Sequence, residues 1–156
     1  MIDQLGKPIP SRILVRYKAR QTATDALPQV YDRTYNYEVL DDPMGDGFLV
    51  YALASTRDPD EIMVGGHFRI SVSKDGTKTT AVDALSRSLL ILSKHPKDTN
   101  GSEPVAYTMS HIVSSTPVET HVFVSRQNDK PFFIATGKDE VWKVEKGKIM
   151  KAKAQK

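Results

Sequence analysis

Two histidines and a glutamate lie close together in the C-terminal half of the chain, at His111, Glu119 and His121. The segments around them are apolar and of strand length, and the residues between them include the serines and the proline that turns favour. If the two segments form a hairpin with Val113 opposite Glu119, His111 falls opposite His121, with Cβ atoms roughly 5 Å apart. Two imidazoles at that distance can share a metal ion or a proton, and Glu119 lies on the same face by strand parity.

Two interpretations of this pair compete. In the first, the histidines are neutral, hydrogen-bonded parts of the core, as polar side chains on an apolar face usually are. In the second, His111, His121 and Glu119 hold a divalent metal, or act as acid and base, in a small enzyme. Either depends on the register, because a shift of one residue moves every side chain of one strand to the opposite face. We expect the first, and therefore no catalytic residue and no cofactor.

Other catalytic patterns are missing from the sequence. The chain has no cysteine, which excludes disulfides, thiolate metal sites and cysteine nucleophiles. It has no glycine-rich phosphate loop, dinucleotide fingerprint, HExxH helix or nucleophile elbow. The sequence therefore favours a non-catalytic module that binds an unidentified protein or small molecule over an enzyme.

Basic residues concentrate near the two ends of the chain, although the net charge is only +3. Residues 146–156 contain five lysines and no acid, and residues 7–20 contain a second basic cluster. Such clusters can bind phosphate backbones, so contact with nucleic acid is a further hypothesis. The C-terminal residues concerned are Lys146, Lys148, Lys151 and Lys153. No aromatic side chain is interleaved with them for stacking on bases, which favours a solvated tail.

Strand patterns dominate the N-terminal two thirds of the chain. Apolar and basic residues alternate over 12–20, which predicts a strand with one wet face. A helix fits this segment less well, although its basic residues at 12, 16 and 20 would share one helical face. A potential capping threonine predicts one short helix over 24–31. The apolar run 48–54 predicts a buried strand, and the alternating segment 67–84, interrupted by an Asp-Gly pair, predicts a hairpin with a two-residue turn or a close relative of it.

The chain is organised around its C-terminal segment, residues 104–149. Four apolar-rich segments alternate there with turn-like breaks, which predicts a four-stranded antiparallel meander. The whole sequence predicts an α+β fold in a single domain, with about seven or eight mostly antiparallel strands and one short helix in its N-terminal half. We expect the domain to cover residues 1–149 and residues 150–156 to form a basic flexible tail.

The sequence contains no targeting or membrane signal. No window reaches the roughly 18 apolar residues of a membrane span, and the N-terminal residues lack the pattern of a signal peptide. We therefore expect a soluble protein without a membrane span. It would be cytoplasmic if Met1 is the natural start, and periplasmic or secreted if a signal segment has been removed.

A group of small uncharacterised bacterial proteins, often exported, resembles this chain over residues 64–149. The resemblance rests on GGHFRISVSKDG, ALSRS, SHIVSSTPVETHVFVS and PFFIATGKDEVWKVEKGKI. The segment that contains His111 and His121 is its most distinctive part. The resemblance implies an exported precursor in some members and implies no catalytic residue. This chain departs from the group by lacking a signal segment, which puts its compartment in doubt.

Overall fold

The computed structural model describes residues 6–97, 102–137 and 139–152. Two helices and ten strands lie in this part of the chain. They form two compact units that alternate along the sequence. Unit 1 runs up to Ala54 and continues with Phe68–Ala84, whereas unit 2 consists of Ser55–His67 and the chain from Leu85 onward. Each unit has a hydrophobic core of its own.

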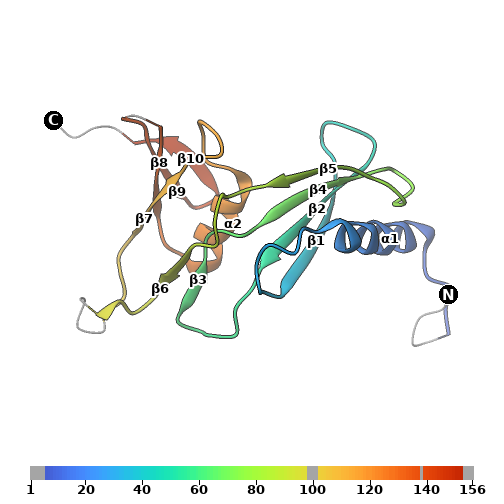
Figure 1. Ribbon diagram of the computed structural model, residues 1–156, viewed down its shortest axis with the longest axis horizontal. Helices are drawn as coiled ribbons and strands as arrows, with labels where there is room; N and C mark the ends of the chain where they lie inside the picture. The colour runs from blue at the N-terminus through green and yellow to red at the C-terminus, as the bar shows by residue number, and fades with distance from the viewer. Residues whose placement is uncertain (1–5, 98–101, 138, 153–156) are drawn as a thin grey trace. The chain divides into compact units, whose positions relative to one another are not determined.

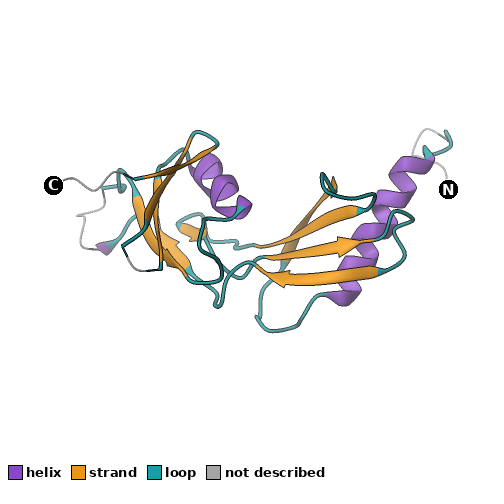
Figure 2. Cartoon of the chain, turned by 90° about the horizontal axis from the view of Figure 1, so that it is seen from above, coloured by secondary structure: helices purple, strands orange, loops and turns teal. Residues whose placement is uncertain are grey.

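Unit 1 is a four-stranded antiparallel sheet with a helix against one face (Figures 1 and 2). The strands lie in the order β1 (Tyr35–Asp41), β2 (Phe48–Ala54), β4 (Phe68–Val72) and β5 (Thr79–Ala84). The helix is α1 (Ser11–Ala26). Its Ala19 and Ala23 belong to the same core as Val50 and Ile70 of the sheet. Small alanines on the buried side let a helix approach a sheet closely, which is how α1 covers the central strands.

The strand predicted for residues 12–20 is wrong, because these residues belong to α1. The buried side chains of α1 are Ala19 and Ala23, and Leu27, the residue after the helix, is buried as well. They recur every four residues, as one face of a helix requires. Ile13 and Tyr17 are 49% and 56% exposed. The apolar alternation that suggested a strand therefore came partly from apolar side chains that face solvent.

The short helix predicted for residues 24–31 is wrong, because α1 ends at Ala26 and residues 27–34 are not helical. The hydroxyl of Thr24 donates to the Arg20 carbonyl within α1 instead of capping a helix start.

The remaining predicted elements of unit 1 are present. The predicted strand at 48–54 is β2, and the predicted hairpin at 67–84 consists of β4 and β5. The N–H of Ser73 donates to the carbonyl of Lys78 at 2.9 Å. The connection therefore runs from Ser73 to Lys78, longer than a two-residue turn.

The turn between β4 and β5 packs against α1 at a glycine. Gly76 has a φ of 73°, and a Cβ there would lie 2.7 Å from the carbonyl oxygen of Val15. The hydroxyl of Thr22 donates to the Gly76 carbonyl at 2.7 Å. Only glycine combines this backbone conformation with so close an approach.

Unit 2 contains a four-stranded sheet and a two-stranded sheet (Figure 1). The four-stranded sheet has the order β10 (Lys148–Lys151), β9 (Val141–Glu145), β8 (Phe132–Thr136) and β7 (Tyr107–His111). The short strands β3 (Glu61–Met63) and β6 (Ile91–Ser93) pair with each other. Helix α2 (Glu119–Asn128) connects β7 to β8 and packs Val124 into a core with Phe132 and Val144.

The predicted four-stranded C-terminal sheet is confirmed, but one of its expected members is a helix. Residues 119–127, predicted as a strand, lie in α2. Because α2 crosses from β7 to β8, these two strands are parallel, whereas the other pairs of this sheet are antiparallel. The buried residues of α2 are Thr120, His121, Val124 and Ser125. This spacing is that of a helix packed on one face.

The α+β class with mostly antiparallel strands is confirmed. The bounds expected for the domain, residues 1–149, stay a prediction. The tail predicted for residues 150–156 begins within a strand, since β10 continues to Lys151, and residues 153–156 lie outside the described part. Neither of the described helices has the length and apolar character needed to cross a membrane.

Candidate functional site

His111 and His121 lie in contact, but a helix brings them together instead of a second strand. His111 is the last residue of β7, and His121 is the third residue of α2. Their ring centroids are 4.7 Å apart, with the planes at 89°. Both side chains are buried within unit 2, each 3% exposed. The cross-strand register that placed them opposite each other is therefore wrong, although the two rings do meet.

His121 closes the first turn of α2. Its Nδ1 accepts the N–H of Val118, the residue before the helix, at 3.0 Å. Its own N–H donates to the Val118 carbonyl, also at 3.0 Å. Glutamate or glutamine usually takes this position. A neutral imidazole that accepts at Nδ1 carries its proton on Nε2, so His121 has no lone pair for a metal while it caps the helix.

The hydrogen bonds of His111 fix its tautomer as well. The hydroxyl of Ser114 donates to the carbonyl of Thr116 at 2.6 Å. The contact of 2.8 Å between His111 Nε2 and Ser114 Oγ must then be donated by the ring. His111 therefore carries its proton on Nε2, and the lone pair of its Nδ1 stays available.

A third buried histidine, His67, belongs to the same region of unit 2. Its Nε2 lies 3.2 Å from the carbonyl oxygen of Met63, and the ring donates to that oxygen. His67 also acts on His121 electrostatically. The sequence contained no signal for this approach, because His67 comes from a distant segment just before β4.

Burial lowers the pKa of all three histidines, because it penalises the charged form. The pKa of His121 falls to about 4, through burial first and then through the repulsion of His111 and His67, while Glu119 opposes the shift. Burial also lowers the pKa of His111. The pKa of His67 is lowered by burial, against its hydrogen bond to the Met63 carbonyl. The three rings are therefore neutral near neutral pH.

Glu119 lies in the first turn of α2, two residues before His121. A carboxylate there interacts favourably with the helix N-terminus. Within the described ranges, no group of three or more His, Asp or Glu side chains is placed to hold a metal ion. Together with the tautomer of His121, this geometry favours a structural role for the predicted set of His111, His121 and Glu119.

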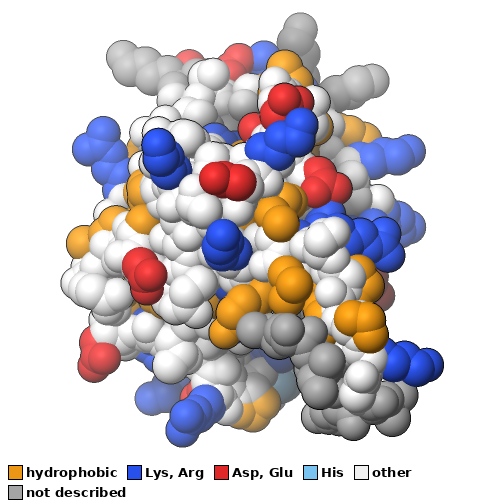
Figure 3. Space-filling model, turned by 90° about the vertical axis from the view of Figure 1, so that its right-hand side faces the viewer, with side chains coloured by type: hydrophobic (Ala, Val, Ile, Leu, Met, Phe, Trp, Pro, Cys, Tyr) orange, Lys and Arg blue, Asp and Glu red, His pale blue; other side chains and the backbone are white. Residues whose placement is uncertain are grey.

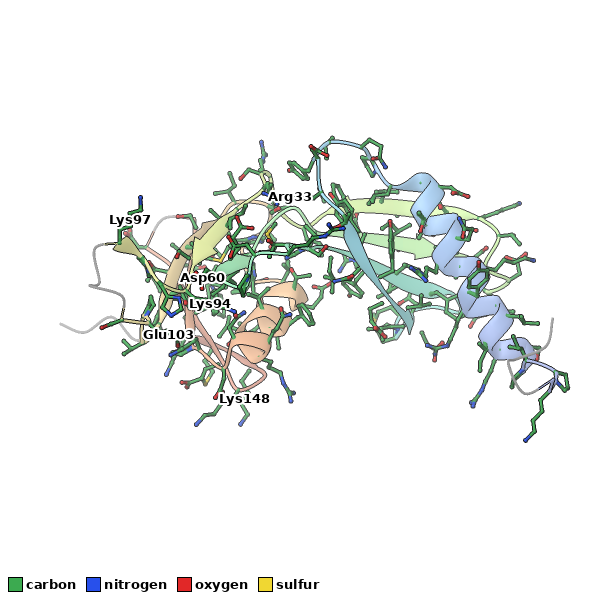
Figure 4. All side chains as sticks on the ribbon, turned by 90° about the horizontal axis from the view of Figure 1, so that it is seen from below. Arg33, Asp60, Lys94, Lys97, Glu103 and Lys148 are labelled. Carbon is green, nitrogen blue, oxygen red and sulfur yellow. The ribbon has the colours of Figure 1, made fainter. Side chains whose placement is uncertain are left out.

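A separate cluster of charged side chains, which sequence reasoning missed, surrounds His95 in unit 2. Its Nδ1 lies 3.0 Å from Oδ1 of Asp60, and its Nε2 lies 3.8 Å from Oε1 of Glu103 (Figure 4). Glu103 also pairs with Lys130 at 3.3 Å. The side chains of His95, Asp60 and Glu103 are between 42% and 61% exposed, so solvent screens these pairs and each contributes little.

Two arginines of α1, Arg16 and Arg20, are engaged within unit 1. Arg16 donates to the carbonyl of Val39 at 2.8 Å and to the carboxylate of Asp41 at 2.7 Å. The guanidinium of Arg20 lies 5.4 Å from the ring centroid of Tyr37. This side of the helix therefore faces β1. Acidic and basic side chains are interspersed on the face drawn in Figure 3, without a broad patch of one sign.

The C-terminal lysines are placed in different surroundings. Lys146 occupies the turn between β9 and β10, and Lys148 starts β10 (Figure 4). Lys151 pairs with Glu140 at 2.6 Å and lies 5.7 Å from the ring centroid of Trp142. Lys153 lies outside the described residues. Contact with nucleic acid through these lysines stays a prediction.

The outer edge of β5 is open. Only β4 pairs with β5 among the described strands. The N–H of Leu85 donates to the carbonyl of His67 at 3.0 Å. Because hydrogen-bonded and non-hydrogen-bonded pairs alternate in an antiparallel ladder, Asp83 also bonds to β4, and the N–H and C=O groups of Val82 and Ala84 point outward.

Few charged side chains lie on this edge strand. Val82 and Ala84 are exposed. The one charged side chain of β5, Asp83, binds Arg69 directly opposite, with Oδ2 and Nη2 3.0 Å apart. The ladder is irregular only near Ser71 and Val72, toward the other end of β5.

The predicted resemblance to small exported bacterial proteins stays a prediction. Comparison of this chain with family models, with curated proteins and with solved structures gives no match in any of the three.

Proposed function

We propose that the protein is an interaction module whose unit 1 binds an extended segment of a partner protein alongside β5. The observation that carries the proposal is the outward direction of the backbone groups of Val82 and Ala84 on an exposed strand. Such groups form main-chain hydrogen bonds with an added strand, while side chains on alternate positions supply specificity.

The edges of the two four-stranded sheets at β1, β10 and β7 are each obstructed. Arg16 binds the carbonyl of Val39 on β1. Lysines stand at both ends of β10, and lysines on an edge discourage pairing. Residues 64–65, 86–88 and 90 line a pocket together with residues of β7, so they lie beside that strand. By contrast, β5 has no lysine, arginine or proline.

The side chains of β5 indicate what the segment should look like. Val82 shares the face of Ile70, the side that α1 covers, and is 38% exposed. An apolar, preferably β-branched residue of the partner would pack beside Val82. On the other face, Asp83 is already paired with Arg69, so a small or polar residue suits the position next to it. The partner is therefore an extended segment with alternating apolar and polar residues.

Selection of random displayed peptides on the immobilised protein tests this proposal. We expect the selected peptides to alternate as described, and to protect the amides of Val82 and Ala84 from hydrogen exchange. Val82→Pro removes an outward N–H without removing a donor from the ladder to β4. We expect it to weaken the selected peptides at least about tenfold, since one backbone hydrogen bond and the fit of the strand are lost.

Val82→Thr is the matched control, because it keeps the N–H and the β-branched shape. It should lose less affinity than Val82→Pro, and both variants should unfold near the denaturant concentration of the parent. Peptides that bind Val82→Pro as tightly as the parent, or that protect amides elsewhere, would show that β5 is not the docking edge.

A further inference from the structure

A small pocket lies at the outer edge of β7 in unit 2. Its volume is about 120 Å³. Much of its lining is apolar, contributed by Val64, Leu90, Met109 and Ile112. The polar residues that also line it are Ser86, Arg87, Ser88, Ser110 and His111. Apolar cavities of roughly 150 Å³ take up a benzene-sized molecule, so this pocket matches a single small ring.

One ring nitrogen of His111 is unused beside this pocket. Its Nε2 donates to Ser114, and Nδ1 has no hydrogen-bond partner in the described part of the chain. In that part, Tyr35 has the only fully enclosed side-chain polar atom without a partner. His111 lines the pocket, and its Nδ1 is not among the fully enclosed atoms without a partner, which fits an Nδ1 that faces the pocket.

The protonation of His111 decides which group this nitrogen can accept. A neutral imidazole with its proton on Nε2 offers only a lone pair at Nδ1. Carboxylate, phosphate and ketone oxygens are themselves acceptors and gain nothing there. A hydroxyl group donates to such a nitrogen, and a buried acceptor left without a donor is unfavourable. The ligand must therefore bring a donor into an otherwise largely apolar space.

The nearby serine does not point to a hydrolytic reaction. The hydroxyl of Ser86 accepts the N–H of Gly66 at 2.7 Å and donates to the carbonyl of Ser88 at 2.9 Å. The proton and one lone pair of Ser86 Oγ are therefore engaged in hydrogen bonds with the backbone, and His111 does not activate this hydroxyl. The arrangement is suited to binding.

We propose that this pocket binds a small, mostly apolar molecule with one hydroxyl group, such as a phenol, whose hydroxyl donates to Nδ1 of His111. The apolar ring would displace water from the surfaces of Val64, Leu90 and Met109. This site lies in unit 2 and does not depend on strand addition at β5.

Titration with phenol and toluene tests the proposal. The two probes have nearly the same size, but only phenol has a hydroxyl. We expect phenol to bind roughly tenfold more tightly, the factor that one hydrogen bond supplies. In ¹⁵N spectra of the histidine rings, phenol should shift Nδ1 of His111 and leave Nδ1 of His121 in place. Benzoate, which lacks a donor, should not produce this shift.

Two variants separate the hydroxyl from the apolar part. His111→Phe keeps a ring but removes the acceptor, so it should bring the affinity for phenol down to that for toluene. Leu90→Trp should fill the pocket and weaken both probes. If neither probe binds the parent protein, or if both bind equally without a shift at Nδ1 of His111, the proposal is overturned. The shift in the parent decides the matter even if His111→Phe fails to fold.

Discussion

The imidazole of His121 stands edge-on to that of His111, with the ring centroids 4.7 Å apart, while its Nδ1 caps helix α2. The same nitrogen cannot be protonated and still accept the N–H of Val118. Acidification therefore acts on one ring that is both buried and part of the helix start. The stability of unit 2 is linked to pH through this residue.

We predict that acid destabilises the protein through His121. Its pKa is 6.5 when unfolded and about 4 when folded, so the unfolded state binds the proton more readily. The contribution to stability is complete above about pH 6.5 and is lost as pH falls toward about 4, by roughly 2 to 3 kcal/mol. His67 and His111, with lowered pKa values, add in the same direction.

His121→Gln separates titration from capping in this prediction. Glutamine is a usual residue at this helix position and can accept the N–H of Val118, but it does not titrate. Urea unfolding at about pH 7 and about pH 5 should show a smaller loss of stability in the variant than in the parent. His95→Gln, at an exposed site, should retain the parent's loss. An equal loss of stability between the two pH values in all three proteins would show that His121 does not cause the pH dependence.

A second prediction concerns the glycine between β4 and β5. Gly76→Ala should destabilise the protein by more than about 2 kcal/mol, because it combines a positive φ with a Cβ 2.7 Å from the Val15 carbonyl oxygen. Gly137→Ala is the matched control, since Gly137 has a φ of 66° and no atom within 4 Å of an added Cβ. It should cost only about 1 kcal/mol. Similar values from denaturant unfolding would contradict the close packing of this turn on α1.

A third prediction concerns Arg16 at the edge of β1. Arg16→Ala should lower the free energy of unfolding by about 1 kcal/mol, because the hydrogen bonds to Val39 and Asp41 are lost at a partly exposed site. It should also speed amide exchange in β1. Arg12→Ala, at an exposed position in the first turn of α1, should do neither. Equal effects of the two substitutions would mean that Arg16 does not secure this edge.

The sequence allowed the central part of unit 1 to be predicted because its patterns have one interpretation. The run 48–54 is too short and too uniformly apolar for a surface helix, and the alternation in 67–84 breaks at a turn pair. Both became strands. In these segments local preference and burial point the same way.

The two helices were not predicted because their sequences fit both a helix and a strand periodicity. Only the burial of particular side chains in the folded protein distinguishes the two. In residues 12–20, the small Ala19 is buried whereas the larger Ile13 is half-exposed. The size of the apolar side chains therefore did not indicate which face of the helix packs against the sheet. In 119–127, His121 and Ser125 lie four residues apart on a buried face, and they also share strand parity. Polar residues buried by specific hydrogen bonds are not marked by hydrophobicity.

The contact between His111 and His121 was predicted from a secondary structure that proved wrong. Alternation suggested a hairpin, whereas the contact arises from the cap of α2 beside the end of β7. Pro117 and Glu119, before and inside the first helical turn, were the available signals of a helix start. His67 could not have been added, since its approach depends on tertiary packing.

The alternation of the two units along the chain has a consequence for synthesis. All strands of unit 1 have left the ribosome once residue 84 has emerged, when unit 2 has contributed only Ser55–His67. Chains fold from the N-terminus as they are made. Unit 1 can therefore complete its sheet while β3 still lacks its partner β6, and the nascent chain carries an unpaired strand of unit 2 until the segment after Leu85 arrives.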